Sequence, residues 1–204
     1  VYLVDRTIPM LPEHLCNGIC SLRPDEEKLA YSCIFEMDDN ANIINHRIRK
    51  TVIKSDRRFT YEEAQEIIET GKGDYAEEVL TLDRLAKALR KRRFEHGSVN
   101  FDRFEVRFEI DETGHPISVY FKVSKDANKL VEEFMLLANK QVATDIGNPG
   151  GRKKAKPFVY RIHDNPDPDR MTNFAEIANR FGYKVRTTGK RTDINNSLNK
   201  MLSS

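Results

Sequence analysis

The amino-acid sequence predicts an α+β fold, in which an antiparallel or mixed sheet packs against helices. Two pairs of runs alternate apolar and polar residues on either side of turn-forming residues, 29–37 with 43–53 and 101–110 with 117–123. Such alternation indicates strands, and each pair indicates a hairpin. Longer stretches carry apolar residues at helical spacing, above all 126–147. Hairpins mixed with helices define the α+β class.

The first quarter of the chain predicts a short strand, a proline-rich connector and the first hairpin. Residues 1–4 form an apolar run, and the prolines at 9 and 12 keep 8–12 extended, with one helical turn expected at 13–15. Alternation places Arg47 and Arg49 on one face of the second hairpin strand. One face of the first strand collects five apolar or small residues, Leu29, Tyr31, Cys33, Phe35 and Met37.

Two helices are expected next. Thr60 followed by Glu63 has the spacing of a capping box, in which the threonine hydroxyl and the glutamate carboxylate each accept from the other residue's backbone N–H. A helix should therefore run from there to residue 70 and end at Gly71. A longer helix is expected over 75–95, ended by Gly97.

The stretch 126–147 predicts the longest helix, with Asp126 as its N-cap and an apolar stripe along one face. Glu132 and Glu133 adjoin an apolar run within it. Neighbouring helical positions point about 100° apart, so at most one of these glutamates can lie wholly on the solvated face. The other should border the packed face, where a carboxylate needs a partner.

The last quarter predicts a basic, glycine-containing loop at 148–157, a strand at 158–163 and two helices. The first of these helices is expected to be capped near Thr172 and to end at Gly182, and the last to be capped by Asp193.

Composition describes a soluble globular chain of 204 residues, with 39% hydrophobic and 32% charged residues. No apolar run approaches the ~20 residues that span a bilayer, and the start does not read as a signal peptide. Cys16, Cys20 and Cys33 lack zinc-ligand spacing and are expected as free, core-packed thiols in a reducing cytoplasm. Because the chain opens on a valine within a strand-like run, we expect a piece of a longer protein.

Basic residues cluster at 47–58, 84–93 and 152–156, although the net charge is only +2. Such clusters suit phosphate-backbone binding, but solvated helix and strand faces are the default interpretation of charge alone. Tyr2, Tyr61 and Phe101 stand at element edges, where rings either stack on bases or pack against the core. Nucleotide-binding glycine loops, H-E-x-x-H and G-x-S-x-G are absent from the sequence. The residues alone therefore indicate a single-strand nucleic-acid binder of undefined mechanism.

Four stretches together resemble the catalytic RNB domain of the ribonuclease II / ribonuclease R family, and they are closer to ribonuclease R. They are IPMLPEHL-C-NGICSLRP at 8–24, RFTY at 58–61, KLVEEFMLLAN at 129–139 and FVYRIHDNP at 158–166. They follow the order of the family and span nearly the whole chain.

The resemblance implies a processive, hydrolytic 3′→5′ exoribonuclease that uses Mg²⁺ to degrade single-stranded RNA to nucleoside 5′-monophosphates. It implies RNA contacts for four residues: Tyr2 as the ring at the channel mouth, Phe101 as its opposite clamp, Tyr61 against the terminal nucleotide, and Glu132 as an inward-facing carboxylate that selects ribose. A carboxylate that accepts from the 2′-OH is physically sensible, since that hydroxyl distinguishes RNA from DNA.

The family's metal-binding aspartates and its phosphate-contacting arginine fall outside residues 1–204. We therefore expect the chain to be the central part of one catalytic domain, with no catalytic or metal ligand of its own, and to be inactive alone. Exposed sheet edges are expected to favour self-association. Two alternatives remain open: a non-catalytic RNA-binding relative of the family, and a structural protein–protein domain.

Overall fold

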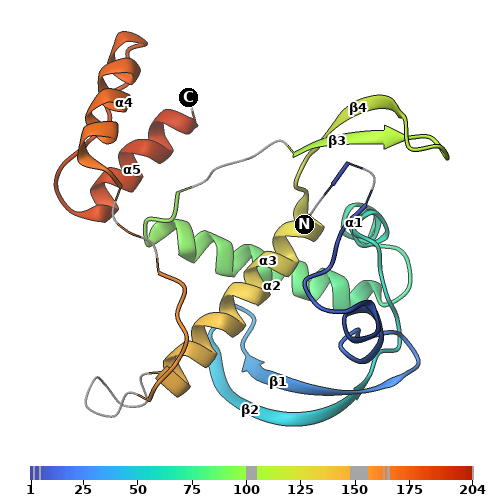
Figure 1. The fold of residues 1–204 in the computed structure, drawn as a ribbon. Helices are drawn as coiled ribbons and strands as arrows, with labels where there is room; N and C mark the ends of the chain where they lie inside the picture. The colour runs from blue at the N-terminus through green and yellow to red at the C-terminus, as the bar shows by residue number, and fades with distance from the viewer. Residues whose placement is uncertain are drawn as a thin grey trace.

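The computed structural model describes residues 1, 3–4, 6–99, 105–147, 156–162, 164 and 166–203, and it shows an α+β fold (Figure 1). The strands are β1 (Glu27–Met37), β2 (Ile43–Lys54), β3 (Glu105–Ile110) and β4 (Pro116–Lys122). The helices are α1 (Tyr61–Thr70), α2 (Ala76–Glu95), α3 (Asp126–Val142), α4 (Pro168–Arg180) and α5 (Arg191–Leu202), with π-helical turns η1 (His14–Ile19) and η2 (Ala143–Gly147).

Both predicted hairpins are present as separate, two-stranded antiparallel sheets. In the first, Glu27 pairs with Lys54 and the register runs to Met37 opposite Ile43. In the second, Glu105 pairs with Lys122; positions 101–104 of the predicted strand lie outside the described residues. The described strands form no larger sheet, so helices rather than further strands supply most of the packing.

The β1–β2 hairpin curves beneath α3 (Figure 1). Its long strands do not bury one continuous face. Near the turn, Cys33 and Phe35 are partly covered, whereas Leu29 and Tyr31 on the same face are exposed. The right-handed twist of a long two-stranded ribbon turns one face away from its support along its length. The register confirms that the alternate residues of β1 share one face, as predicted, but only the half of that face nearest the turn is partly covered.

Helices α1, α2 and α3 form the central unit, with α2 and α3 crossing each other (Figure 1). Its buried apolar side chains include Ile67, Val79, Ala86 and Ala127. One buried hydrogen bond ties two helices together, since the Ala127 N–H donates to Gln65 Oε1 at 3.0 Å. The start of α3 is thereby held against α1.

The capping box of α1 is confirmed, and its two bonds explain why the helix begins where it does. Glu63 N–H donates to Thr60 Oγ1 at 3.1 Å, and Thr60 N–H donates to Glu63 Oε2 at 2.7 Å. Gly71 ends the helix at a φ of 70°, a left-handed conformation that favours glycine.

Three other predicted caps are wrong by one to several residues. The N-cap of α3 is Lys125 rather than Asp126, and that of α5 is Lys190 rather than Asp193. The cap of α4 is Asp167, whose carboxylate accepts from two backbone N–H groups, and not a residue near Thr172. Pro168 directly after it has a backbone already suited to the first helical position, so the helix starts earlier than its apolar pattern.

Two predicted strands are also wrong within the described residues. Residues 156–162 carry no strand, and Val159 and Ile162 are exposed; His163 lies outside the described residues. Val1, Leu3 and Val4 are likewise not in a strand, although Val1 and Ile8 pair through backbone hydrogen bonds. An apolar run becomes a strand only where another backbone completes its hydrogen bonds. The turn expected at 13–15 is the longer π-helical η1.

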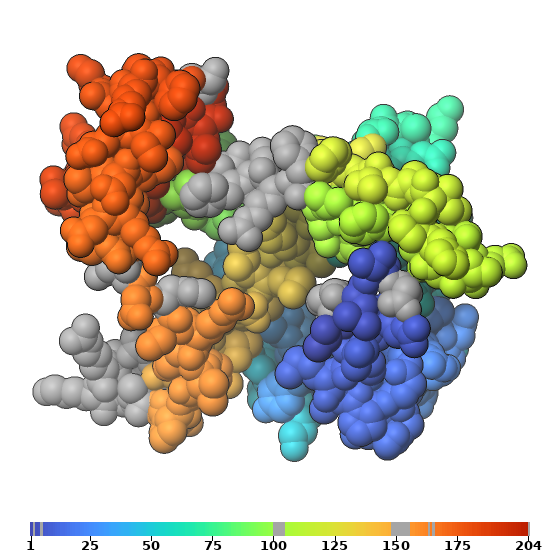
Figure 2. Space-filling view, turned by 45° about the horizontal axis from the view of Figure 1, so that its top comes forward, coloured from blue at the N-terminus to red at the C-terminus, as the bar shows by residue number. Residues whose placement is uncertain are grey.

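Helices α4 and α5 form a pair at one edge of the molecule (Figures 1 and 2). Asn195 and Asn199 of α5 donate to the carbonyls of Gly97 and Ser98, just after α2. The cysteines are free thiols as predicted, but Cys20 is exposed rather than packed in the core. Of the helices in the described part of the chain, none is both long and apolar enough to cross a membrane.

Candidate nucleic-acid interface

Of the four residues for which RNA contacts are predicted, the structure describes two. Tyr2 and Phe101 lie outside the described residues. Tyr61 and Glu132 are described, and they come from two helices that pack against each other, α1 and α3.

Tyr61 is the first residue of α1 and is exposed. The capping box before it leaves the helix N-terminus, with its partial positive charge, beside the ring. Lys122 of β4 brings a cation to 5.6 Å from the ring centroid. The tyrosine thus combines an accessible aromatic face with one nearby cation, Lys122, whereas the carboxylates of Glu62 and Glu63 lie in the first turn of the same helix.

Tyr61 also borders a hollow of about 560 Å³ between α1, α2 and the start of α3. Two further rings line it, Phe59 and Tyr75, which meet edge to face with centroids 6.4 Å apart. The Arg57 guanidinium lies 5.1 Å from the Phe59 centroid and pairs with Glu63 at 3.0 Å. Aromatic walls suit a nucleobase, whereas the charge of Arg57 is already paired with Glu63 and with Asp74 at 3.6 Å.

Glu132 lies half-exposed on α3, with 49% of its side chain accessible, and its Oε1 accepts from Arg93 Nη2 at 3.0 Å. Glu133 is the buried glutamate, with only 3% of its side chain accessible. The expectation that Glu132 is the inward-facing residue is therefore wrong. Position 133 shares a helix face with Leu130 and Leu137, which turns it toward the packed side. The contact of Glu132 with ribose stays a prediction.

The buried carboxylate has the partners that its burial requires. Arg93 Nε donates to both Glu133 oxygens at 3.1 and 3.2 Å, and Arg93 Nη2 donates to Oε1 at 2.5 Å. Arg90 adds a second guanidinium 3.6 Å from the same oxygen. Sequence reasoning anticipated a partner for one glutamate but missed the two arginines on α2.

Tyr61 and Glu132 are related indirectly, through Asn128 of α3. Tyr61 and Asn128 both border a smaller hollow of about 210 Å³. Glu132 follows Asn128 by four residues, close to one helical turn, so the two point in similar directions. Glu132 itself lines neither of the two hollows that Tyr61 borders, so the described residues do not bring these two side chains together in one hollow.

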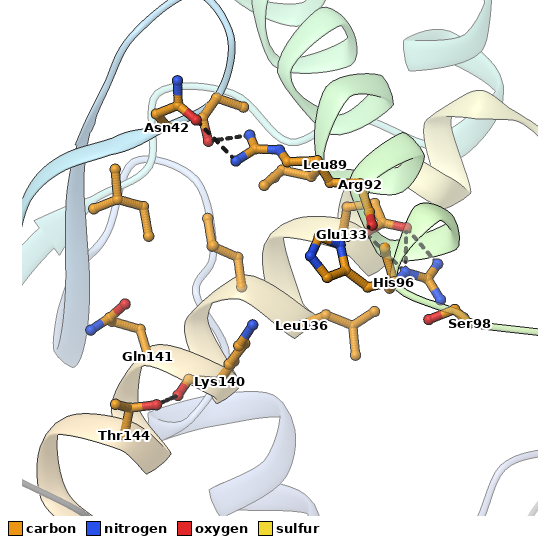
Figure 3. A pocket seen from close by; sticks show the side chains of 14 residues that line it. Asn42, Leu89, Arg92, His96, Ser98, Glu133, Leu136, Lys140, Gln141 and Thr144 are labelled. Carbon is orange, nitrogen blue, oxygen red and sulfur yellow. Dashed lines mark hydrogen bonds and ion pairs between the residues drawn. The ribbon is translucent and has the colours of Figure 1, made fainter. Parts of the chain in front are cut away.

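A larger cleft of about 870 Å³ opens on another side, between the end of α2, α3 and the turn of the β1–β2 hairpin (Figure 3). Arg92 lies in its wall and donates to the carbonyls of Asn40 and Ala41 at 2.7 and 2.6 Å. Its charge therefore holds the hairpin turn in place. Sequence reasoning did not find this cleft, because its walls come from three distant segments.

The structure separates basic residues that pair with carboxylates from basic residues that remain exposed to solvent. The 84–93 cluster is largely paired: Arg84 bonds Asp39, Lys87 bonds Asp83 and Asp126, and Arg93 bonds both glutamates. This favours a structural role. On β2, four exposed basic residues have no ion-pair partner in the described part of the chain, namely Arg47, Arg49, Lys50 and Lys54. These remain available to phosphates.

A polar cluster that the sequence did not reveal joins β2 to the end of α3. His46 Nε2 lies 2.6 Å from Asp145 Oδ2, and Gln141 Nε2 donates to Asp145 Oδ1 at 2.8 Å. Burial, and secondly the Asp145 carboxylate, raise the pKa of the nearby Cys33 thiol. Because the thiolate is the nucleophile, a raised pKa argues against covalent catalysis by Cys33.

The described residues do not fit a metal centre. Nowhere among them do three or more His, Cys, Asp or Glu side chains gather into a group able to hold a metal ion. No metal-dependent step is therefore assigned to the described side chains.

Comparisons with known proteins give a consistent relationship. The protein-family model described as RNB domain matches residues 1–204. Ribonuclease R 1 of Lactococcus lactis subsp. lactis is 36% identical over 202 residues, which cover 95% of this chain and 24% of that protein. Exosome complex exonuclease dis3 of Schizosaccharomyces pombe is 46% identical over 180 residues, which cover 87% of this chain and 18% of that protein.

A solved structure of Mycoplasma genitalium RNase R, in complex with ribose methylated single-stranded RNA, has the same fold. The match has a TM-score of 0.79 at 23% identity, and covers 94% of this chain and 30% of that one. The chain spans about a quarter of the length of the Lactococcus relative.

Proposed function

The chain belongs to the RNB-domain family of ribonucleases, and from this premise we propose that it is the central part of an exoribonuclease catalytic domain that binds the 3′ end of single-stranded RNA. The parent protein degrades RNA processively in the 3′→5′ direction and releases nucleoside 5′-monophosphates. The observation that carries the proposal is Tyr61, an exposed ring at a helix N-terminus beside Lys122, which borders a hollow lined by two further rings.

Each described group has a distinct task in this proposal. Tyr61 stacks on a terminal base, an interaction worth about 1–3 kcal/mol. Lys122 attracts the adjacent phosphate. Glu132 accepts a hydrogen bond from the ribose 2′-OH, which DNA lacks. Tyr2 and Phe101 would contribute further stacking, as the resemblance implies.

The hydrolytic step belongs to parts of the parent protein beyond these side chains. Mg²⁺, held there by carboxylates, would activate water and stabilise the leaving oxygen. The share of the relatives that the chain spans, together with the lack of a metal-binding group among the described residues, supports this division. The isolated chain should therefore bind RNA without cutting it.

Binding is tested by titrating the chain into fluorescently labelled oligo(A) and oligo(dA) and following the anisotropy. Wild-type chain should prefer oligo(A), and Tyr61→Ala should weaken RNA binding by at least about fivefold, as the loss of one stacked base predicts. Tyr183→Ala is the matched control, because Tyr183 is an exposed tyrosine just after α4. Unchanged binding by Tyr61→Ala would remove the main support for the proposal.

Hydrolysis is tested separately, by incubating the labelled oligo(A) with the isolated chain in Mg²⁺ buffer. Release of mononucleotides would refute the proposed inactivity. The same assay on the whole parent protein separates the leading proposal from a non-catalytic RNA-binding relative, since a binder would retain the anisotropy response and release no product.

We also propose that the isolated chain self-associates through the β1–β2 hairpin. Leu29, Tyr31 and Val52 lie exposed on one face of this two-stranded sheet, whose outer edges have no further strand among the described residues. An open edge beside an apolar face favours pairing with a second copy. A monomer mass that stays constant with concentration in sedimentation would count against it.

A further inference from the structure

The geometry points to Arg93 as a positioning residue for ribose recognition: it holds the half-exposed Glu132 in place, and the buried Glu133 in turn orients Arg93. This inference rests on the proposed function, because it assumes that Glu132 meets the ribose. It adds a residue on a different helix, α2, for which the sequence indicated no role in ribose recognition.

The hydrogen bonds of the guanidinium define the order of support. Arg93 Nε and Nη2 form one edge of the guanidinium, and both donate to the carboxylate oxygens of Glu133 at N···O distances of 2.5–3.2 Å. The Nη2 atom has a second N–H, and it donates to Glu132 Oε1 at 3.0 Å. A planar guanidinium seated against one carboxylate has no freedom to turn, so the direction of the bond to Glu132 is set by Glu133.

Burial decreases from Glu133 through Arg93 to Glu132, in the same order as the hydrogen bonds that support Glu132. The accessible fraction of the side chain rises from 3% at Glu133 to 27% at Arg93 and 49% at Glu132. Arg93 also lies 5.1 Å from the ring centroid of Phe94, which supports its guanidinium from the side. The buried Glu133–Arg93 pair thus holds the Glu132 carboxylate, which remains accessible to solvent and to a ligand.

Charge in the cluster is balanced. Two guanidiniums, Arg90 and Arg93, stand against the two carboxylates. Glu132 Oε1 is engaged by Arg93, whereas Oε2 accepts no hydrogen bond from the described residues. That second oxygen is free to accept the 2′-OH of a ribose while the first stays anchored.

Anchoring matters because an exposed glutamate has several rotatable bonds. Fixing such a side chain at the moment of binding costs conformational entropy, and a prior ion pair reduces that cost. A lysine at position 93 would retain the charge, but its ammonium cannot hold two carboxylates with the fork geometry of a guanidinium. The positioning role therefore predicts a loss of ribose selectivity in a charge-conserving variant.

The test measures the ratio of dissociation constants for oligo(dA) and oligo(A), by fluorescence anisotropy on the chain and its variants. Wild type should favour RNA by about tenfold, the value of one charge-assisted hydrogen bond. Glu132→Ala should bring the ratio close to one. Arg93→Lys should lower it to about threefold or less, and should have no further effect when combined with Glu132→Ala.

Arg92→Lys is the matched control. Arg92 adjoins Arg93 on the same helix, but it bonds the β1–β2 turn and neither glutamate. It should leave the DNA-to-RNA ratio unchanged, even if the hairpin is destabilised. Circular dichroism melts establish that every variant compared is folded at the temperature of the titration.

A second variant avoids disturbing the buried pair. Glu132→Asp retains the charge and shortens the side chain by one methylene, so the carboxylate cannot reach Arg93 and the ribose together. It should lower the ratio as Arg93→Lys does.

The outcomes separate this inference from the proposed function. Wild-type chain that binds RNA and DNA equally would overturn both. Selectivity that is lost in Glu132→Ala, yet intact in Arg93→Lys and Glu132→Asp, would overturn the positioning role alone and leave Arg93 as a structural partner of Glu133.

Discussion

Glu133→Gln should be among the most destabilising single changes on α3. The variant removes the negative charge from a side chain that is 3% accessible and that receives the hydrogen bonds of Arg93 at 2.5–3.2 Å. Breaking one partner of a buried pair costs about 3–5 kcal/mol, because the other charge is left uncompensated. Here the two guanidiniums are 19% and 27% accessible, so water reaches them in part. We therefore expect a loss near the lower end, about 3 kcal/mol.

Glu132→Gln is the matched control, since it makes the same chemical change one residue earlier on the same helix. Its carboxylate is 49% accessible and meets Arg93 through one hydrogen bond. Half-exposed ion pairs contribute about 0–1 kcal/mol, so its loss should be under about 1 kcal/mol. Urea denaturation followed by far-ultraviolet circular dichroism gives both free energies of unfolding.

Equal losses for the two variants would refute the reasoning, because they would mean that burial does not decide the strength of these pairs. A loss under about 1 kcal/mol for Glu133→Gln would do the same. An altered slope with urea would instead indicate a changed denatured or native state, and the comparison would then rest on the midpoints of thermal melts.

Three further predictions concern stability and charge. Thr60→Ala should lower the free energy of unfolding, measured by urea denaturation, by about 1 kcal/mol. The Thr60 backbone N–H and hydroxyl hold the pKa of Glu63 below its usual value. The stability from this cap is therefore complete above the ordinary glutamate pKa and is lost as the pH falls through the lower pKa of the folded state. Lys87→Met should destabilise the chain at neutral pH, because it removes the hydrogen bond to Asp83 that raises the pKa of Lys87. The difference in melting temperature from wild type should vanish as the pH rises through the pKa that Lys87 has in the folded state. Arg49→Gln, on β2, should weaken oligo(A) binding and reduce the slope of log affinity against log salt by about 0.7, whereas an unchanged slope would exclude a phosphate contact there.

Much of the secondary structure could be predicted because its signals are local. The capping box of α1 involves residues three apart, and the alternation in β1 and β2 is read within each strand. The caps predicted for α4 and α5 are wrong, because Asp167 and Lys190 cap these helices before their apolar patterns begin. The strand expected at 158–163 failed because its residues lack a neighbouring backbone within the described chain.

The sequence by itself determined the two hairpins, the helices, the resemblance to RNB domains and the need of one α3 glutamate for a partner. Only the tertiary structure decided that Glu133 is the buried one, that Arg93 rather than Arg92 serves it, and that Tyr61 opens onto a hollow. The physical reason is the range of the interactions. Backbone hydrogen bonds and apolar periodicity are encoded within a few residues. The pairing of charges across helices depends instead on how α2 crosses α3, and this crossing is determined jointly by residues that are far apart in the sequence.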